Sequence, residues 1–324
     1  MVPGGEYGAT VEVRVVVNCG AGSVDDDAVD EQRTEVTAAF AAAGADPSID
    51  FVQGDRLEAA IRAAAERSPT TVVVAGGDGS LGTAAGVLAG GDVPLGILPL
   101  GTFNHFAKDL GIPLELEAAA AVALSGPVQA VDVAEVNGRC FVNNSSLGVY
   151  PAMVGIRDRI REQRGWGKIR AVPVAAWRVL RRFPVRRLDI TAAGYRAELR
   201  TPFVFVGNDR YEIGPSGVGE RTVLDRGEVC LYVARAASRR KLMGIALRSV
   251  VRGSTAVPEL EEHCAPEIVV AARHHRLSVA VDGEVVTLRS PLRYRSRERA
   301  LPVRVGAGPG EAPTDPAGAD AEPR

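Results

Sequence analysis

A single carboxylate stands inside a glycine-rich segment, GGDGS, at residues 76–80. The β-branched run before it predicts a buried strand, and the Leu/Ala-rich run after it predicts a helix. Glycine N–H groups at such a turn can approach a polyphosphate closely, and the helix directs its positive end at the same anion. Asp78 could then reach a magnesium ion, directly or through water. An ordinary Asp-Gly turn is the alternative, and it stays open because no lysine completes a Walker loop here.

A second polar turn, PLGTFNHFA, follows the next buried strand along the chain. It carries Pro99, Gly101, Thr102, Asn104 and Phe106. In parallel sheets, ligands bind beyond the carboxyl ends of the strands, which meet at one edge. Two such turns from adjacent strands therefore predict a ligand cleft at that edge.

Strands and helices alternate over the first part of the chain. The expected strands are residues 11–22, 70–77 and 93–101, and the expected helices are residues 25–44, 55–68 and 81–90. This alternation predicts a doubly wound parallel α/β domain, with helices on both faces of the sheet, over residues 11–134.

The second half changes to short strands joined by Asn-Gly, Asp-Gly and Gly-rich turns. The expected strand segments are residues 187–200, 201–208, 227–236 and 276–288. They predict a mainly antiparallel β-sandwich domain over residues 135–303, with a cleft between the two domains. Residues 304–324 are rich in Gly, Pro and Ala with scattered acids, which predicts a disordered tail.

The composition, the cysteine positions and the lengths of the apolar stretches exclude several classes of protein. The 324-residue chain has a formal net charge of only -2. Its cysteines, Cys19, Cys140, Cys230 and Cys264, lie far apart without C-x-x-C spacing, which argues against a disulfide framework and a zinc site and fits a reducing cytosol. No apolar stretch approaches the roughly 20 residues that span a bilayer, and the first ten residues lack the apolar region of a signal peptide. We expect any work on a membrane to be done from its surface.

Charge is unevenly distributed, because residues 157–187 hold eleven Lys/Arg against two acids. Apolar residues recur there at helical spacing and arginines fall around the other face: Val174, Trp177 and Leu180 against Arg178, Arg181 and Arg182. This pattern predicts a helix resting on an anionic bilayer, to which each basic residue contributes about 1 kcal/mol of attraction. The alternative is an ordinary amphipathic helix that packs Trp177 on the β domain.

Taken in order, these motifs resemble the diacylglycerol kinase catalytic domain, a family that includes bacterial diacylglycerol kinases, sphingosine and ceramide kinases and a bacterial phosphatidylglycerol kinase. GGDGS is similar to the family's G-G-D-G-[TS] nucleotide loop, and PLGTFNHFA to its P-x-G-T-x-N-D-F-A segment. Four further segments resemble its first-strand turn, domain crossover, second-domain strand and catalytic turn: NCGAG, VDVAEVNGRCFVNNSSLG, GNDRYEIG and VDGE. The resemblance covers about residues 11–303.

The resemblance implies a site for ATP and Mg²⁺. The residues that it implies around the nucleotide phosphates are Asn18, Gly20, Gly22, Gly76, Gly77, Asp78, Gly79 and Ser80, with the hydroxyl of Thr102 nearby. It implies Asp78 and Asp132 in the magnesium network, and Asp78 and Glu284 as catalytic residues, with Glu284 accepting the proton of a lipid hydroxyl. Without the family, VDGE would be interpreted as a hairpin with an Asp-Gly turn.

Some positions depart from the family pattern. His105 stands where members commonly carry an aspartate of the magnesium network, which removes a negative charge from the ion site. Its imidazole either hydrogen-bonds a phosphate or a metal-bound water, or packs at the edge of the cleft. Arg226 stands where several bacterial members have an acid of a structural magnesium site, which argues against that site here. Cys19 and Gly82 replace a frequent proline and asparagine, and neither change removes a group that the chemistry requires.

The resemblance thus implies an ATP-dependent lipid kinase of phospholipid biosynthesis, with diacylglycerol as the favoured acceptor and phosphatidic acid as the product. It also implies a cytoplasmic enzyme, peripherally associated with the inner face of the cell membrane, that has no nucleic-acid partner; a homodimer stays open. One alternative is a soluble kinase such as an NAD kinase or a phosphofructokinase, which also carry a G-G-D-G loop. PLGTFNHFA together with VDGE favours the lipid kinase. A second alternative is a catalytically weak lipid-binding regulatory protein, against which the retained Asp78 and Glu284 argue.

Overall fold

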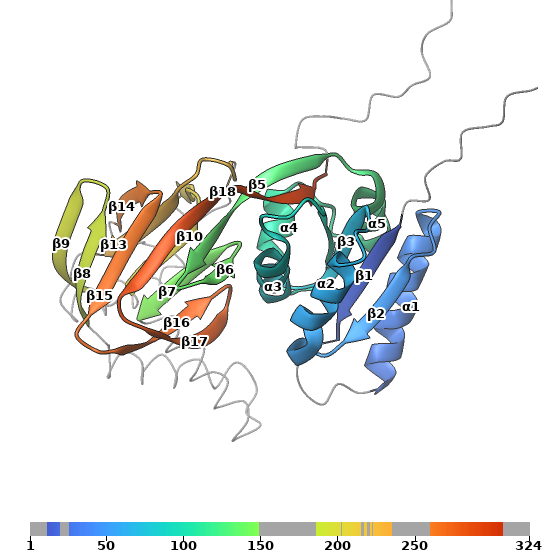
Figure 1. Ribbon diagram of the computed structural model, residues 1–324, viewed down its shortest axis with the longest axis horizontal. Helices are drawn as coiled ribbons and strands as arrows, with labels where there is room; N and C mark the ends of the chain where they lie inside the picture. Colours follow the sequence, from blue (N-terminus) through green and yellow to red (C-terminus); the bar gives the residue numbers. More distant parts are fainter. Residues whose placement is uncertain are drawn as a thin grey trace, which may run out of the picture. The chain divides into compact units, whose positions relative to one another are not determined.

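The computed structural model of the chain describes residues 12–19, 26–148, 186–201, 203–214, 217–218, 221, 223–234 and 260–306 (Figure 1). Contacts divide the chain into two compact units. The α/β unit comprises the described residues within 1–77, 92–129 and 302–324. The β unit comprises those within 78–91 and 130–301.

A parallel sheet with the strand order β2-β1-β3-β4 forms the centre of the α/β unit. Its strands are β1 (Val13–Asn18), β2 (Ser48–Val52), β3 (Thr71–Gly76) and β4 (Leu95–Pro99). Every residue of β3 and β4 is buried, as expected for central strands covered on both faces. The end of β18 (Leu292–Arg304) adds to this sheet, where Val303 pairs with Leu95. The parallel pairing predicted for the first part of the chain is confirmed.

Helices pack on this sheet within the α/β unit. They are α1 (Asp26–Ala42), α2 (Leu57–Ala65), α4 (His105–Asp109) and α5 (Leu116–Ser125), with the 3-10 turn η1 (Gly54–Arg56) before α2. α1 and α5 share one core with β1, β3 and β4, in which Phe40 and Ala123 are buried. α2 lies across the sheet from α1 (Figure 1) and buries Leu57, Ile61 and Ala64, which recur at helical spacing.

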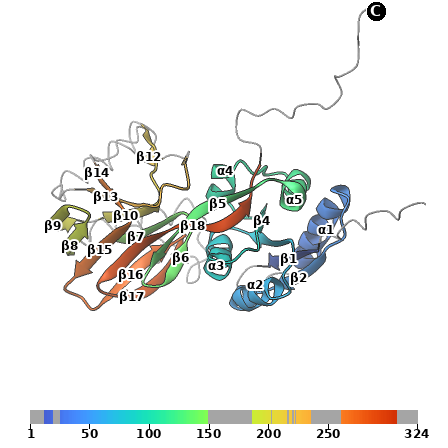
Figure 2. The same ribbon diagram turned by 45° about the horizontal axis from the view of Figure 1, so that its top comes forward.

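The described β unit contains antiparallel strands and the helix α3 (Asp78–Leu88) (Figure 2). One sheet has the order β14-β13-β10-β7-β16-β17, with β7 (Asn144–Gly148), β10 (Phe203–Asn208), β13 (Val229–Ala234), β14 (Leu260–Ala265), β16 (Arg276–Val281) and β17 (Glu284–Arg289). A second set runs β18-β15-β8-β9 with β5 and β6 attached: β5 (Val128–Val136), β6 (Arg139–Phe141), β8 (Arg186–Ala192), β9 (Tyr195–Thr201) and β15 (Glu267–Ala272). A short ribbon pairs β11 (Ile213–Gly214) with β12 (Gly217–Val218). Side chains of both sets, such as Leu147 and Ile268, share one hydrophobic core.

Helix α3 belongs to the β unit by its contacts, although it lies between β3 and β4 in the sequence. The boundaries 11–134 and 135–303 stay a prediction, but the contacts group α3 with the second half rather than the first. The predicted start of this helix at Leu81 is wrong, because α3 begins at Asp78. A carboxylate in the first turn of a helix is favoured by the helix dipole.

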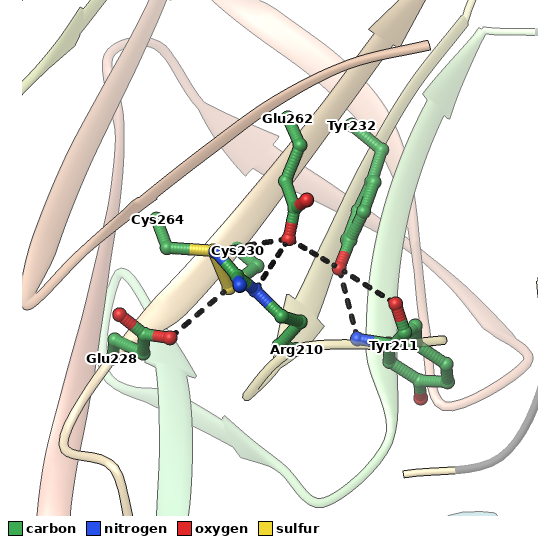
Figure 3. A network of polar contacts seen from close by, with 7 residues as sticks. All are labelled: Arg210, Tyr211, Glu228, Cys230, Tyr232, Glu262 and Cys264. Atoms are coloured by element: carbon green, nitrogen blue, oxygen red, sulfur yellow. Dashed lines mark hydrogen bonds and ion pairs between the residues drawn. A yellow bond between two sulfur atoms is a disulfide. The ribbon is translucent and has the colours of Figure 1, made fainter. Parts of the chain in front are cut away.

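The prediction against disulfides is wrong for one pair, because Cys230 and Cys264 are bonded (Figure 3). They lie 34 residues apart in the sequence. The antiparallel register of β13 and β14 places them directly opposite each other. The spacing of the cysteines in the sequence does not reveal this disulfide, because the pairing depends on the register of the two strands. Cys19 and Cys140 are free thiols.

The predicted start of a disordered tail at residue 304 is also wrong. Arg304 ends β18, donates from Nε to Thr71 Oγ1 at 2.9 Å and from Nη1 to the Gly126 carbonyl at 2.7 Å. Residues 307–324 lie outside the described residues, as do residues 149–185 with the predicted membrane-surface helix around Trp177. Among the described residues, no helix combines the length and the apolar character needed to cross a membrane.

Candidate active site

Three of the predicted phosphate-binding positions lie at strand ends of the α/β unit. Asn18 ends β1, Gly76 ends β3, and Thr102 follows β4. These strands are parallel neighbours, so their carboxyl ends stand at the one edge where such sheets bind ligands. Gly20 and Gly22 lie outside the described residues.

The two glycine-containing turns at this edge touch through their backbones. A Cβ atom on Gly101 would lie 2.6 Å from the Cα atom of Gly77, and a Cβ atom on Gly77 would lie 3.2 Å from the Cα atom of Gly101. Real Cβ atoms essentially never lie as close as 2.6 Å to another heavy atom, and 3.2 Å is tighter than most Cβ contacts in a close-packed interior. Glycine at both positions is therefore what allows the turn after β3 and the turn after β4 to meet.

Asn104 holds the second turn closed. It adopts the left-handed conformation, with φ of 52°, which asparagine tolerates better than most residues. Its Oδ1 accepts from the Gly101 N–H at 2.9 Å, and its Nδ2 donates to the Gly101 carbonyl at 2.9 Å and the Pro99 carbonyl at 3.3 Å. This buried side chain fixes the loop that presents Thr102 at the surface.

His105 is the first residue of α4 and is exposed. Its ring stacks on that of Phe103, with centroids 5.6 Å apart and an interplanar angle of 10°. Phe103 is 64% exposed, which is unusual for so large an apolar side chain. The position that carries an aspartate in the family pattern therefore belongs to a surface aromatic pair here.

In the β unit, the carboxylate of Asp78 is held by Asn143. The Nδ2 of Asn143 donates to Asp78 Oδ1 at 2.9 Å, and the Oδ1 of Asn143 accepts from Arg221 Nη2 at 2.8 Å. A guanidinium can only donate, so the oxygen of the Asn143 amide must face Arg221 and its NH₂ group must face Asp78. Arg221 thereby fixes the amide in the orientation that donates to the carboxylate.

Arg221 is itself almost fully buried, at 2% exposed. Its Nη1 donates to the carbonyls of Val142 at 2.7 Å and Asn208 at 2.8 Å. Its guanidinium also lies over the ring of Tyr211, 5.1 Å from the centroid, and the Tyr211 hydroxyl donates to the Asn143 carbonyl at 3.1 Å. A buried arginine needs such a set of acceptors to offset its lost hydration.

Glu284 lies beside the start of α3 within the same unit. Its Oε1 stands 3.0 Å from the place where a Cβ atom on Gly79 would be, and Gly79 is the residue after Asp78. Its Oε2 accepts from Arg139 Nη2 at 2.6 Å, a charge-assisted hydrogen bond that orients the carboxylate. The Glu284 side chain is 56% exposed. The structure thus brings together Asp78 and Glu284, which lie far apart in the sequence.

Asp282 anchors the turn that carries Glu284. Asp282 and Gly283 have φ of 44° and 86° in the two-residue turn between β16 and β17, so the VDGE segment is a hairpin. The Asp282 carboxylate accepts from the N–H groups of Val142, Asn143 and Asn144 at 2.8–3.0 Å. Burial raises the pKa of Asp282 to about 7, despite these hydrogen bonds.

Gly82 gives α3 its close approach to this turn. A Cβ atom on Gly82 would lie 2.6 Å from Asp282 Oδ2. The family's frequent asparagine would have no room at this position without a shift of the turn. The departure at Gly82 is therefore a packing feature of the helix against the hairpin.

Asp132 lies in a second group of acids in the β unit. Its Oδ1 accepts from the Arg299 N–H at 2.6 Å and its Oδ2 from the Gly227 N–H at 2.5 Å. Burial raises its pKa, and the charge of Asp225 adds to the effect. These contacts tie the loop before β13 to β18, so Asp132 has a structural task alongside its predicted magnesium role.

Four residues of this site were missed in the sequence: Arg139, Asn143, Arg221 and Asp282. The two consecutive asparagines of the crossover segment were a signal, because buried amides in an apolar run need partners. Arg221 gave no local signal, since its acceptors lie on segments far away in the sequence.

Comparison with known proteins assigns a family to the first segment of the chain. The family model of the diacylglycerol kinase catalytic domain matches residues 12–136. This segment belongs to the diacylglycerol kinase catalytic domain family. The domain includes both turns of the sheet edge, Asp78 and Asp132, and it ends with β5, before Asn143 and Glu284.

Similar proteins include lipid kinases, and a similar solved structure shares the fold. The probable lipid kinase YegS-like of Citrobacter koseri is 46% identical over 83 residues, which cover 24% of this chain and 28% of that protein. Lipid kinase YegS of Escherichia coli is 45% identical over the same length. The chain thus matches little more than a quarter of these relatives. A putative diacylglycerol kinase from Bacillus anthracis, with a TM-score of 0.67 and 23% identity over 91% of this chain and 97% of its own, shares the fold.

Proposed function

We propose that the chain is an ATP-dependent lipid kinase that transfers the γ-phosphoryl group to a lipid hydroxyl, with diacylglycerol as acceptor and phosphatidic acid as product. The observation that carries the proposal is the Glu284 carboxylate beside Gly79, one residue from Asp78. Asp78 is suited to bind the metal of a nucleotide, and Glu284 is suited to accept a proton. The two roles thereby fall to neighbouring carboxylates.

Glu284 is the proton acceptor in this proposal. Arg139 orients its carboxylate, and more than half of the side chain is exposed, so an acceptor molecule can reach it. As the hydroxyl oxygen forms its bond to the γ-phosphorus, its proton passes to Glu284. The bond from the γ-phosphorus to the bridging oxygen breaks, and ADP leaves.

The residues at the start of α3 fit a magnesium ion. Carboxylate oxygens are the ligands that Mg²⁺ prefers, and Asn143 holds the Asp78 carboxylate in one orientation. When bound, the ion neutralises charge on the transferred phosphoryl group. Gly76 and Gly77, with Asn18, Thr102 and the N–H groups of Gly79 and Ser80, are proposed to hold the phosphates of ATP; Asp132 stays a second proposed ligand of the ion.

The acceptor belongs to a membrane, so we propose that the chain works at a lipid surface on the cytoplasmic side of the cell membrane. Phosphoryl transfer to a lipid needs no nucleic-acid partner. The residues that would make the surface contact, around Trp177, lie outside the described part of the chain.

The test is a transfer assay on the full chain. Purified protein is incubated with labelled ATP, Mg²⁺ and vesicles that carry a broad lipid panel, and the products are identified by mass. We expect labelled phosphatidic acid. Glu284→Gln should remove nearly all of it. Glu267→Gln is the matched control, because Glu267 is also an exposed acid, 51% exposed, that pairs with an arginine.

Two outcomes would overturn the proposal. Failure to label any lipid of the panel, with magnesium-dependent nucleotide binding also absent by thermal shift, would favour a lipid-binding regulatory protein. Phosphorylation of NAD in the absence of lipid would favour a soluble kinase. Labelling of another lipid would keep the chemistry and replace diacylglycerol as the acceptor.

A further inference from the structure

Two cysteines and two glutamates share one face of the β13–β14 pair (Figure 3). Cys230 and Cys264 are directly opposite each other. Glu228 precedes Cys230 by two residues, and Glu262 precedes Cys264 by two residues, so each glutamate projects from the same side of its strand as its cysteine. This face is opposite to the one that packs in the hydrophobic core, where Val229 and Leu231 are buried.

Each glutamate places a carboxylate oxygen near the sulfur of its own cysteine. Glu228 Oε1 lies 3.7 Å from Cys230 Sγ, and Glu262 Oε1 lies 3.5 Å from Cys264 Sγ. The ligand atoms of Glu228, Cys230 and Cys264 all lie within 4.8 Å of one another. Tetrahedral Zn²⁺, with its usual bonds to sulfur and carboxylate oxygen, separates those two ligand atoms by about 3.5 Å.

To complete such a site the two sulfurs must separate, and the Glu262 carboxylate, which lies outside the close group of Glu228, Cys230 and Cys264, must turn toward them. Bonded sulfurs cannot bind the ion, whereas two thiolates on zinc stand about 3.8 Å apart. Directly opposite residues of an antiparallel pair have Cβ atoms about 4.5–5.5 Å apart, so a small rotation of each cysteine side chain provides this separation.

Groups around the cluster suit thiolates and a bound cation. Arg210 Nε lies 2.8 Å from Glu262 Oε1, and its Nη2 lies 3.9 Å from Cys264 Sγ. A guanidinium beside a thiol favours the thiolate, which is the form that binds metals. The hydroxyl of Tyr232 lies 3.3 Å from Glu262 Oε1 and completes the kind of outer hydrogen bonding that orients metal-binding carboxylates.

The charges of the four proposed ligands also favour a divalent cation. Two thiolates and two carboxylates carry four negative charges, and Zn²⁺ with the adjacent Arg210 offsets three of them. Zinc accepts sulfur and oxygen ligands together, whereas Mg²⁺ and Ca²⁺ take oxygen alone. The donor set therefore selects a thiophilic divalent cation.

We propose that the reduced chain binds one Zn²⁺ through Cys230, Cys264, Glu228 and Glu262. A dithiol converts the disulfide to two thiols by supplying two electrons and two protons and becoming a disulfide itself. A phosphine supplies the two electrons and becomes its oxide, with the protons and the oxygen coming from water. Zinc binding then releases both thiol protons. The disulfide and the zinc site exclude each other, so the redox state of this pair decides whether the cation is held. This site is separate from the proposed kinase chemistry and does not depend on it.

Cobalt replaces zinc as the probe in the test. The full chain is reduced with a phosphine, freed of reductant under anaerobic conditions, and titrated with Co²⁺. We expect one Co²⁺ per chain, a thiolate-to-cobalt charge-transfer band, visible bands of tetrahedral intensity, and loss of all of them when Zn²⁺ is added. The oxidised chain should give no charge-transfer band.

Variants identify the ligands. Cys264→Ser should lose at least half of the intensity of the charge-transfer band, because one of the two thiolates is removed, and Glu228→Gln should weaken Co²⁺ binding by at least about 10-fold. Cys19 and Cys140, the two free cysteines, provide the matched control, and their double serine variant should bind as the parent does. Cys264→Ser also lacks the disulfide, so its unfolding midpoint is compared with that of the reduced parent, which lacks it too.

The proposal is overturned if the reduced parent has four titratable thiols but no charge-transfer band. It is equally overturned by a band of undiminished intensity in Cys264→Ser, since the sulfur ligands would then be other cysteines. Unchanged affinity in both Glu228→Gln and Glu262→Gln would leave no carboxylate ligands and would contradict the four-ligand site.

Discussion

The turn after β4 and the start of α3 both carry site residues, but they are held in opposite ways. In the turn, Asn104 bonds to Gly101, three residues away, and Gly101 touches Gly77 through backbone atoms alone. At the start of α3, Asp78 is held by Asn143, 65 residues away, and Asn143 by Arg221, a further 78 residues along the chain.

The two parts of the site should therefore respond to different kinds of substitution. The turn depends on shape, because glycine leaves no side chain where the backbones meet. The start of α3 depends on charge and on hydrogen-bond direction, because its donors and acceptors are polar side chains from distant segments of the β unit. Substitutions that change volume should act on the turn, and substitutions that change polarity should act on the network.

The largest effect is expected for Glu284→Gln, which alters the site at the start of α3, where the residues come from distant parts of the sequence. The amide keeps the size of the side chain but cannot accept the proton of the acceptor hydroxyl. We expect turnover to fall by about 10² to 10⁴, the usual scale for a positioned general base, while nucleotide affinity stays nearly unchanged. Lipid turnover and nucleotide binding are measured on the same preparation.

Asp78→Asn should fail differently, because one carboxylate would serve the ion and the transfer together. Magnesium-dependent nucleotide affinity and turnover should fall together in this variant. Near-normal turnover in Glu284→Gln would mean that VDGE is a structural hairpin only, and Asp78 would become the first candidate for the base.

The next effect tests shape. Gly101→Ala places a Cβ atom 2.6 Å from the Gly77 backbone, which has no flexible side chain to give way. We expect a loss of about 3 kcal/mol in the free energy of unfolding, at the upper end of the usual cost of overpacking. Urea denaturation measures it.

Gly86→Ala is the matched control for that substitution. Gly86 lies in α3, and a Cβ atom there would meet Cys140 Cβ at 3.8 Å, an ordinary contact. Alanine in a helix interior should stabilise by up to about 1 kcal/mol. If both variants lose the same stability, close backbone approach is not what the glycine at 101 provides.

The same local and long-range division decides what could be predicted from the sequence. The parallel strands and the sheet-edge turn at Gly101 followed from runs of β-branched residues and nearby glycines, all within a few residues. The Cys230–Cys264 bond and the partners of Asp78 depend on strand register in the β unit, which short strands with mixed patterns do not reveal. Asp282 could be assigned to a turn, but not its three backbone donors, which come from β7 and the residues just before it.

A smaller effect is expected when the hydrogen bonds that orient Asp78 are removed. Asn143→Leu keeps the branched shape of the side chain but removes the donor to Asp78 and the acceptor of Arg221. We expect magnesium-nucleotide binding to weaken by about 10-fold, the scale of one hydrogen bond to a charged group, with KM rising more than kcat falls. Ser146→Ala is the control, because the buried Ser146 hydroxyl has no hydrogen-bond partner in the described part of the chain. Equal effects of the two variants would contradict a positioning role for Asn143.

The last effect is a pH dependence of stability that arises in the β unit. Asp209 is fully buried there, and its Oδ2 accepts from the Arg226 N–H at 3.3 Å. Burial raises the pKa of Asp209 from 3.8 to about 6, and the charges of Asp132 and Glu228 act in the same direction. Between about pH 4 and pH 6, the folded chain therefore holds a proton that the unfolded chain has released.

A raised carboxyl pKa makes stability fall as pH rises. The free energy of unfolding should lose up to about 1.4 kcal/mol per pH unit from this group between pH 4 and pH 6, with no further loss above pH 7. Asp209→Asn cannot titrate, so its stability relative to the parent should increase across that window and then stay constant. Urea denaturation of both chains at half-unit steps from pH 4 to pH 8 measures the difference. Parallel curves over the whole range would show that Asp209 releases its proton equally in both states, and the buried acids of this unit would then not contribute to its pH response.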